Sequence, residues 1–190
     1  EEPSLGVHHL THDITPYNTF EASYRLFQTV EYWPKGTTFV SVVDPGVGSS
    51  RKSVVALTKT GQYIVTPDNG TLSYIKKDVG IVAVREISEV ENRRSNTELS
   101  YTFHGRDVYA YTGAKLASGH ISFEEVGPEL PVDKILELPV VETIIEDNLV
   151  RGAIDILDVR FGSLWTSITR DDFYALEPNF GDRFEVTIFN

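Results

Sequence analysis

The spacing of apolar residues predicts alternating helices and strands along residues 1–138. Between positions 19 and 31 the apolar side chains recur every three or four residues, at Phe20, Tyr24, Phe27 and Val30. This spacing is typical of a helix with one buried face, and Asn18 followed by Glu21 resembles the capping box that begins such a helix. Residues 38–43 are nearly all apolar or β-branched, which predicts a buried strand.

Further elements follow at similar spacing. We expect strands over 53–57, 62–66 and 81–87, a short helix over 72–77 and a longer helix over 106–118. Thr60-Gly61 reads as a hairpin-like turn, and Gly119 fits the position just after a helix end. Strands that alternate with helices indicate an α/β fold, and we expect a largely parallel sheet flanked by helices.

The composition of the sequence changes near residues 128–139, where Pro128, Pro131 and Pro139 are interleaved with acidic residues. We therefore expect an N-terminal α/β catalytic domain over 1–138 and the beginning of a smaller C-terminal β domain over 139–190. The expected strands of the second part are 149–158, 164–169 and 183–189.

Composition narrows the classes of function. The chain is 41% hydrophobic and 24% charged, which is the range of globular proteins. Its net charge of −11, without a cluster of Lys and Arg, argues against a nucleic-acid partner. No apolar run approaches the roughly 20 residues of a membrane helix, so we expect no membrane partner. The chain has no cysteine, which rules out disulfides and fits a cytoplasmic protein.

The ends of the chain predict an incomplete sequence. There is no methionine, and the chain opens on Glu1-Glu2-Pro3 shortly before the first patterned segment. Processing or a cloning boundary would explain both features.

The segment VVDPGVGSSR, residues 42–51, carries the strongest candidate chemistry. A buried strand delivers Asp44 to a loop with Gly46 and Gly48, and ligands of open α/β sheets bind at the carboxyl ends of strands. Arg51 is placed to return towards Asp44. A turn that carries a surface ion pair is the alternative interpretation. The loop lacks the pattern of a nucleoside-triphosphate-binding loop.

Two shorter motifs follow strands or precede helices. Asp68 and Asn69 lie in PDNG, which is also ideal turn chemistry. His104 lies in TFHGRD just before a helix, where it would serve as a general base or a water-positioning group, or simply cap the helix.

The segment DVRFGSLWT, residues 158–166, places an acid and aromatic side chains around a glycine. This set suits a purine and a ribose, although a β-turn with core aromatics has the same composition. His8, His9 and His12 invite a metal interpretation, but neighbours on a strand face opposite sides and a clear third ligand is missing. We expect no metal site.

Taken in order, THDITPYN, VVDPGVGSSR, TPDNG, TFHGRD and DVRFGSLWTS resemble the S-adenosylmethionine hydroxide adenosyltransferases, the hydrolase relatives of fluorinases and chlorinases. The resemblance covers residues 11–168. It implies hydrolysis of S-adenosylmethionine to adenosine and methionine, without a cofactor. It also implies a homotrimer in which the substrate lies between the N-terminal domain of one subunit and the C-terminal domain of its neighbour.

The resemblance also implies site residues. The family's catalytic Asp, Arg and His correspond to Asp44, Arg51 and His104. Its substrate pocket corresponds to Tyr17, Phe103, Asp158, Phe161, Ser163 and Trp165, with Asp68 and Asn69 nearby.

The chain departs from the family pattern in three places. The usual first strand ending in Thr-Asp-Phe-Gly is missing, the family's C-terminal domain continues further, and Ser163 stands where Asn is usual. The first two departures weaken the expectation of a complete site, and the third removes one polar contact to the ligand.

Two other functions remain open. A halide-dependent enzyme is one, although halogenases carry Tyr in place of Asp44 and Tyr-Ser in place of His104-Gly105. A non-catalytic fragment that binds S-adenosylmethionine is the other, and the departures at the chain ends favour it.

Overall fold

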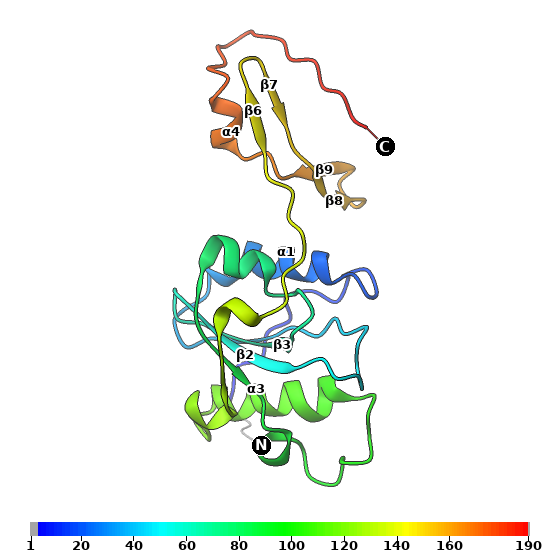
Figure 1. Ribbon diagram of the computed structural model, residues 1–190, viewed down its shortest axis with the longest axis vertical. Coiled ribbons are helices and arrows are strands. Elements are labelled where there is room, and N and C mark those ends of the chain that lie inside the picture. The colour runs from blue at the N-terminus through cyan, green and yellow to red at the C-terminus, as the bar shows by residue number, and fades with distance from the viewer. Residues whose placement is uncertain (1–3, 190) are drawn as a thin grey trace. The chain divides into compact units, whose positions relative to one another are not determined.

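The structure of the protein is a computed structural model that describes residues 4–189 (Figure 1). The chain divides into two compact units, residues 1–138 and 139–190. The division lies between Leu138 and Pro139, at the end of the Pro-rich segment.

A five-stranded mixed sheet forms the centre of the first unit. Its strands are β1 (Thr38–Val40), β2 (Ser53–Thr58), β3 (Tyr63–Pro67), β4 (Ile81–Glu86) and β5 (Glu129–Leu130), in the spatial order β1-β3-β2-β4-β5. The α/β class is therefore confirmed. The prediction of a largely parallel sheet was wrong, because only β1 and β3 pair in parallel and the other described pairings are antiparallel.

The β2–β3 connection explains much of this difference. Thr60 and Gly61 join the two strands in a tight turn, as expected, and Gly61 has φ +92°. A hairpin link of this length pairs its strands antiparallel, whereas a parallel pair needs a longer crossover. The expected strand 38–43 pairs in the ladder only over β1, although Ser41 still donates its N–H to the Val65 carbonyl at 3.0 Å.

Two longer helices cover the sheet. Helix α1 (Thr19–Val30) begins at Asn18, whose side chain accepts the Glu21 N–H. Helix α3 (Ala110–Ala117) continues a π-helical turn, η2 (Gly105–Tyr109), and is followed by Gly119 at φ +73°. The two longer expected helices are confirmed, and the short helix expected over 72–77 is found as a helical segment over 73–79. Shorter helical segments complete the unit: η1 (Ile75–Val79), α2 (Glu89–Asn92), η3 (Glu124–Val126) and η4 (Val132–Lys134).

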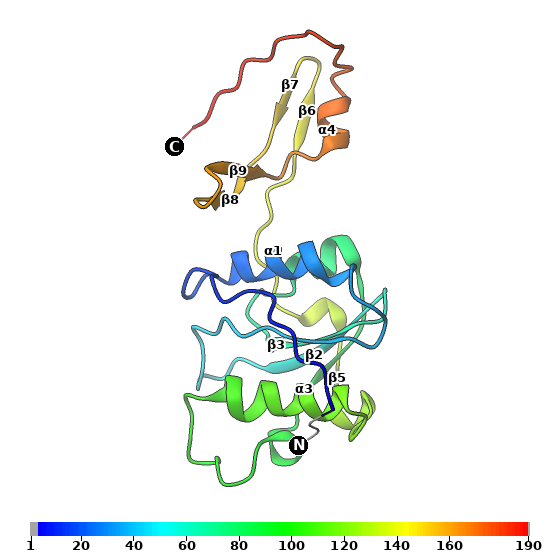
Figure 2. The same cartoon turned by 180° about the vertical axis from the view of Figure 1, so that it is seen from behind.

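The sheet has a buried cluster on each face, and α1 and α3 lie on opposite sides of it (Figures 1 and 2). Alternation along β2 sends Val54 and Ala56 towards the cluster that contains Leu26 of α1, whereas Val55 faces the cluster that contains Leu116 of α3. The sheet is thus fixed between two helical layers, which makes it a rigid base for the loops at its strand ends.

The second unit contains two small hairpins and a short helix. Strands β6 (Ile144–Glu146) and β7 (Leu149–Arg151) form one hairpin, and β8 (Ile154–Asp158) and β9 (Ser163–Thr166) form the other, followed by α4 (Arg170–Tyr174). The expected strand over 149–158 is interrupted at Gly152-Ala153. Among the described residues of this unit, Ile156 is the one buried apolar side chain.

The prediction of a strand over 183–189 was wrong. These residues have no ladder partner in the described part of the chain, and Val186 and Phe189 are exposed. Alternating apolar residues make a segment suitable for pairing, but a strand forms only where a second strand supplies the hydrogen bonds. In residues 4–189 no helix is long and apolar enough to cross a membrane.

Candidate active site

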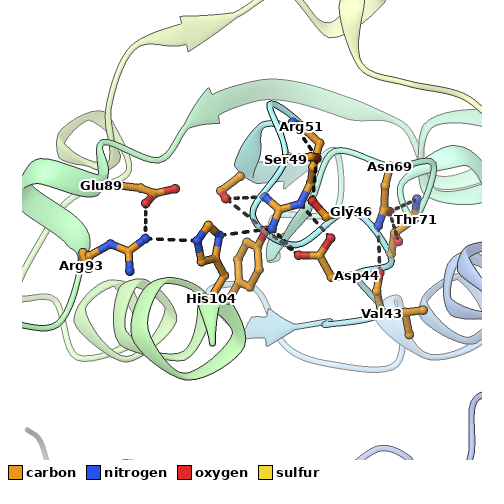
Figure 3. A network of polar contacts seen from close by, with 12 residues as sticks. Val43, Asp44, Gly46, Ser49, Arg51, Asn69, Thr71, Glu89, Arg93 and His104 are labelled. Atoms are coloured by element: carbon orange, nitrogen blue, oxygen red, sulfur yellow. Dashed lines mark hydrogen bonds and ion pairs between the residues drawn. The ribbon is translucent and has the colours of Figure 1, made fainter. Parts of the chain in front are cut away.

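The loop after β1 is anchored to the loop after β3. Asn69 donates its side-chain N–H to the Val43 carbonyl at 2.8 Å, and its Oδ1 accepts the Thr71 hydroxyl at 2.7 Å (Figure 3). Because β1 and β3 are parallel neighbours, both loops leave the same edge of the sheet. Asn69 therefore holds the backbone immediately before Asp44.

Asp44 and Arg51 form a bidentate ion pair across this loop. Arg51 Nε donates to Asp44 Oδ1 at 2.7 Å, and Arg51 Nη2 donates to Asp44 Oδ2. The two side chains are only 6% and 10% exposed, so this is a nearly buried pair and not a surface one. Paired N–H···O bonds of this kind fix the orientation of the carboxylate as well as its charge.

Two residues that the sequence did not indicate complete the environment of Asp44. Arg51 Nη1 donates to Ser53 Oγ at 2.9 Å, Ser53 Oγ lies 3.1 Å from Tyr109 Oη, and Tyr109 Oη donates to Asp44 Oδ2 at 3.5 Å. The contacts close a ring of hydrogen bonds from Arg51 back to Asp44. Burial is the main reason that the pKa of Tyr109 is raised, so the phenol stays protonated as a donor.

His104 stands at the start of η2 and faces the ion pair. Its Nδ1 lies 3.3 Å from Arg51 Nη2, and its Nε2 lies 3.2 Å from Arg93 Nη2. The residue is 6% exposed. Burial is the largest cause that lowers the pKa of His104, and Arg51 and Arg93 act in the same direction, against Glu89 and Asp44. These surroundings favour the neutral form of the imidazole.

An open cleft of about 550 Å³ lies beside His104. The loop after β1 contributes Gly48 and Ser49 to its lining, and Arg93 and Tyr101 line it from the segment before His104. The cleft reaches His104, whose ring contacts the Asp44–Arg51 pair through Arg51. Such a set can orient a water molecule and accept hydrogen bonds from it.

The other predicted residues of the first unit occupy different surroundings. Tyr17 is 76% exposed and has φ +68°, an unusual conformation for a residue with a side chain. Phe103 is exposed, and the Arg106 guanidinium lies 4.9 Å from its ring centroid. Asp68 Oδ1 accepts the Leu136 N–H at 2.9 Å, and burial raises the pKa of this carboxyl. Asp68 and Asn69 thus make internal contacts, as a structural turn would.

The remaining predicted residues lie on the β8–β9 hairpin of the second unit. Asp158 is directly opposite Ser163, and Ile156 is opposite Trp165. Residues two apart on a strand share a face, so Asp158, Ser163 and Trp165 lie on one side of the hairpin. Phe161 is in the connecting turn and is 85% exposed. These four predicted residues thus all belong to one hairpin.

The N-terminal histidines were a weak metal candidate. His9 Nδ1 lies 2.8 Å from His12 Nε2, whereas the His8 ring packs on Trp33 at 5.4 Å between centroids. Residues 4–189 contain no group of three or more His, Asp or Glu side chains placed to hold a metal ion.

The fold and this cluster define a class: an α/β domain whose strand-end loops hold a buried carboxylate–guanidinium pair against a neutral histidine. Residues 1–127 match the family model described as SAM hydroxide adenosyltransferase N-terminal domain. The chain belongs to this family.

Individual relatives are consistent with that membership. The chain is 36% identical over 163 residues to an (R)-S-adenosyl-L-methionine hydrolase of Methanocaldococcus jannaschii, a match that covers 86% of the chain and 54% of the relative. It is 25% identical over 200 residues to a fluorinase of Actinopolyspora mzabensis, covering 93% of the chain and 66% of that relative. The chain thus spans only about half the length of the hydrolase.

A solved structure shares the architecture. The crystal structure of an uncharacterized conserved protein from Thermotoga maritima matches with a TM-score of 0.87 and 37% sequence identity, over 95% of this chain and 66% of that one.

Proposed function

We propose that the protein hydrolyses S-adenosyl-L-methionine to adenosine and L-methionine. The observation that carries the proposal is the cluster of Asp44, Arg51 and His104 in a chain of the SAM hydroxide adenosyltransferase family. The 36% identity to a protein named (R)-S-adenosyl-L-methionine hydrolase supports water as the nucleophile.

The proposed reaction is a displacement at the ribose C5′. A water oxygen forms a bond to C5′ while the C5′–S bond breaks. The electron pair of the C5′–S bond leaves with the methionine sulfur. The leaving group is a neutral thioether, so the enzyme need not supply a general acid. The attacking oxygen loses one proton after the bond forms. The enzyme's contribution is an oriented and partly desolvated water.

The geometry suggests a role for each side chain. Asp44 accepts a hydrogen bond from the water and offsets the positive charge that develops on it. Arg51 holds both oxygens of Asp44 and so sets the direction of the carboxylate. His104, neutral and adjacent to Arg51, completes the orientation of the water.

A halide nucleophile is the first alternative. The Asp44 carboxylate would repel a halide ion at the position where we place the water, which argues against this reading. The identity to the fluorinase is also lower, 25%, than the 36% identity to the hydrolase. A binding fragment without activity is the second alternative, and it predicts the same ligand but no product.

The substrate pocket and the assembly belong to the same proposal. We assign ligand contacts to Tyr17 and Phe103 and to the hairpin residues Asp158, Phe161, Ser163 and Trp165, and we propose a homotrimer in the cytoplasm, without a cofactor. The exposed Phe161 supports an aromatic contact to a purine. Light scattering tests the assembly, because an active monomer would contradict a site shared between subunits.

Chromatography tests the activity directly. Purified protein is incubated with S-adenosylmethionine, with and without high chloride, and the nucleoside products are separated. We expect adenosine in both samples. Formation of 5′-chloro-5′-deoxyadenosine would establish the halide alternative, and ligand binding by calorimetry without product would establish the binding fragment.

A further inference from the structure

His104 lies between two arginines. Arg51 Nη2 is 3.3 Å from Nδ1 and Arg93 Nη2 is 3.2 Å from Nε2, so each ring nitrogen faces a guanidinium nitrogen (Figure 3). A guanidinium only donates hydrogen bonds. A neutral imidazole has one nitrogen that accepts, and an imidazolium has none.

The arrangement therefore opposes protonation of the ring. The acceptor nitrogen of a neutral His104 can accept a hydrogen bond from one of the two arginines, while its single N–H points towards the other arginine. A protonated His104 would direct two N–H groups at two donors and would add a third positive charge to the pair. A neutral ring thus leaves one N–H facing a donor and a charged ring leaves two, so the contacts favour the neutral ring.

Arg93 is held firmly in this position. Its Nη2 contacts Glu89 Oε2 at 2.5 Å, and its Nη1 donates to the carbonyls of Thr97 and Ser100, each at 3.2 Å. The side chain is 9% exposed. Arg93 can turn away from His104 only by breaking these contacts, so it remains at Nε2 in the folded protein.

The other charged groups around the ring do not reverse this effect. Asp44 and Glu89 favour a proton on His104, but each is paired with an arginine that also contacts the ring. Glu98 and Tyr101 line the same cleft from the segment before His104.

We propose that Arg93, held by Glu89, is a positioning residue that keeps His104 neutral and fixes the direction of its ring. Its kinetic consequence rests on the proposed hydrolysis. His104 then holds Arg51 beside Asp44, which orients the attacking water, and the ring does not take the proton of that water. Attack of water at C5′ gives a protonated alcohol, a strong acid, which passes its proton to solvent water in the adjoining cleft.

A titration by NMR tests the proposal without substrate. Protein labelled in its histidine rings is titrated, and the His104 signals are assigned by their loss in His104→Ala. We expect the His104 pKa to lie below the ordinary 6.5. Arg93→Gln should raise it by about 1, because one adjacent like charge is removed. Arg94→Gln is the matched control, since it removes the same charge from the neighbouring exposed residue and should leave the His104 pKa unchanged.

Arg93→Lys separates charge from shape. Lys retains the positive charge but cannot contact Glu89 and the two carbonyls with a planar group. We expect a low His104 pKa in Arg93→Lys, as in wild type, and if Arg93→Gln does not fold, the wild-type His104 pKa still tests the proposal. A wild-type His104 pKa at or above 6.5, or no difference among folded wild type, Arg93→Gln and Arg94→Gln, would overturn the proposal.

The pH dependence of turnover supplies the kinetic test. Arg93→Gln should lose more turnover at pH 6 than at pH 8.5, by at most about tenfold, because a shift of about 1 in pKa changes the neutral fraction of His104 at the lower pH and hardly at the higher one. The Michaelis constant should change little. If the NMR shift is found but no adenosine forms with any variant, the proposed function fails and the role of Arg93 stands. If adenosine forms but the His104 pKa does not change in Arg93→Gln, the proposed function stands and the role of Arg93 fails.

Discussion

The carbonyl oxygen of Tyr101 lies 2.8 Å from the point at which a Cβ on Gly48 would stand. Gly48 also has φ +78°, a conformation that residues with side chains rarely adopt. The loop after β1 and the segment before His104 therefore approach each other more closely than any other residue at position 48 would allow. This close approach joins the loop that carries Asp44 to the segment that precedes His104.

Gly48→Ala should disturb both stability and turnover. We expect a loss of more than about 1 kcal/mol in the free energy of unfolding, because the left-handed backbone alone costs about that much and the contact with Tyr101 adds to it. Turnover should fall by roughly 10- to 100-fold as the loop shifts. Gly119→Ala is the control, since Gly119 has φ +73° with nothing within 4 Å of its Cβ position. Equal stability and turnover in the two variants would show that the contact is unimportant.

The three proposed catalytic residues should behave as one unit. Asp44→Asn, Arg51→Ala and His104→Ala should each reduce turnover by about 10²- to 10⁴-fold, with much smaller changes in substrate affinity. The double variant Asp44→Asn/His104→Ala should be little worse than the poorer single variant, because residues that act together show non-additive losses. Single-turnover kinetics on folded protein measures this.

Glu86→Gln is the matched control for Asp44→Asn. Glu86 pairs with Lys52, the neighbour of Arg51, but that pair is exposed, and exposed pairs contribute little. Near-normal turnover in His104→Ala would remove the water site that we propose.

The hairpin of the second unit should contribute to substrate affinity. Phe161→Ala is expected to raise the Michaelis constant roughly tenfold, since stacking of a base on an aromatic ring is worth about 1–3 kcal/mol. Phe161 is largely exposed, so its removal should leave the hairpin intact. Phe180→Ala removes another exposed phenylalanine of the same unit and should have no effect. The same Michaelis constant in both variants would contradict the assignment of Phe161.

Asp68 should make stability depend on pH. Burial raises the pKa of this carboxyl above its ordinary 3.8 because the buried site favours the protonated, neutral form. The stability that this form contributes is fully present below pH 3.8 and is lost as the pH rises through the folded-state pKa. Asn at this position still offers an acceptor to the Leu136 N–H. Asp68→Asn should therefore gain stability relative to wild type between pH 4 and pH 7.5, by urea unfolding.

Asp133→Asn is the control for this comparison, because Asp133 is 75% exposed and pairs with Lys134 at 3.8 Å. A stability difference between Asp68→Asn and wild type that is constant with pH would contradict a buried carboxyl. A raised Michaelis constant in Asp68→Asn would instead support the contact to substrate that we expected from the sequence.

Local signals predicted the local structure well. The cap of α1 at Asn18, the turn at Thr60-Gly61 and the glycine after α3 each depend on a few neighbouring residues, and each is present. Strand pairing depends on a distant partner that the apolar pattern does not specify. For that reason the positions of β2 and β4 were predictable from the apolar pattern, whereas their antiparallel pairing was not.

The candidate site shows the same limit. Asp44 and Arg51 are separated by a short loop whose glycines indicate a return of the chain, so their meeting was predictable. Tyr109 reaches Ser53 across 56 positions, and it is one of many apolar residues in its helix pattern. Arg93 comes from a segment without a clear pattern, and only the three-dimensional path of the chain brings it to His104.

The guanidinium of Arg51 serves several partners at once: Asp44, Ser53, His104 and the ring of Tyr109. In evolutionary terms such sharing makes these positions epistatic, since replacing one partner changes the effect of replacing the others. A lineage that exchanges water for another nucleophile must then alter the carboxylate and the histidine together while giving the arginine new acceptors. We therefore expect a single substitution at Asp44 or His104 to weaken the attack of water without creating activity towards another nucleophile.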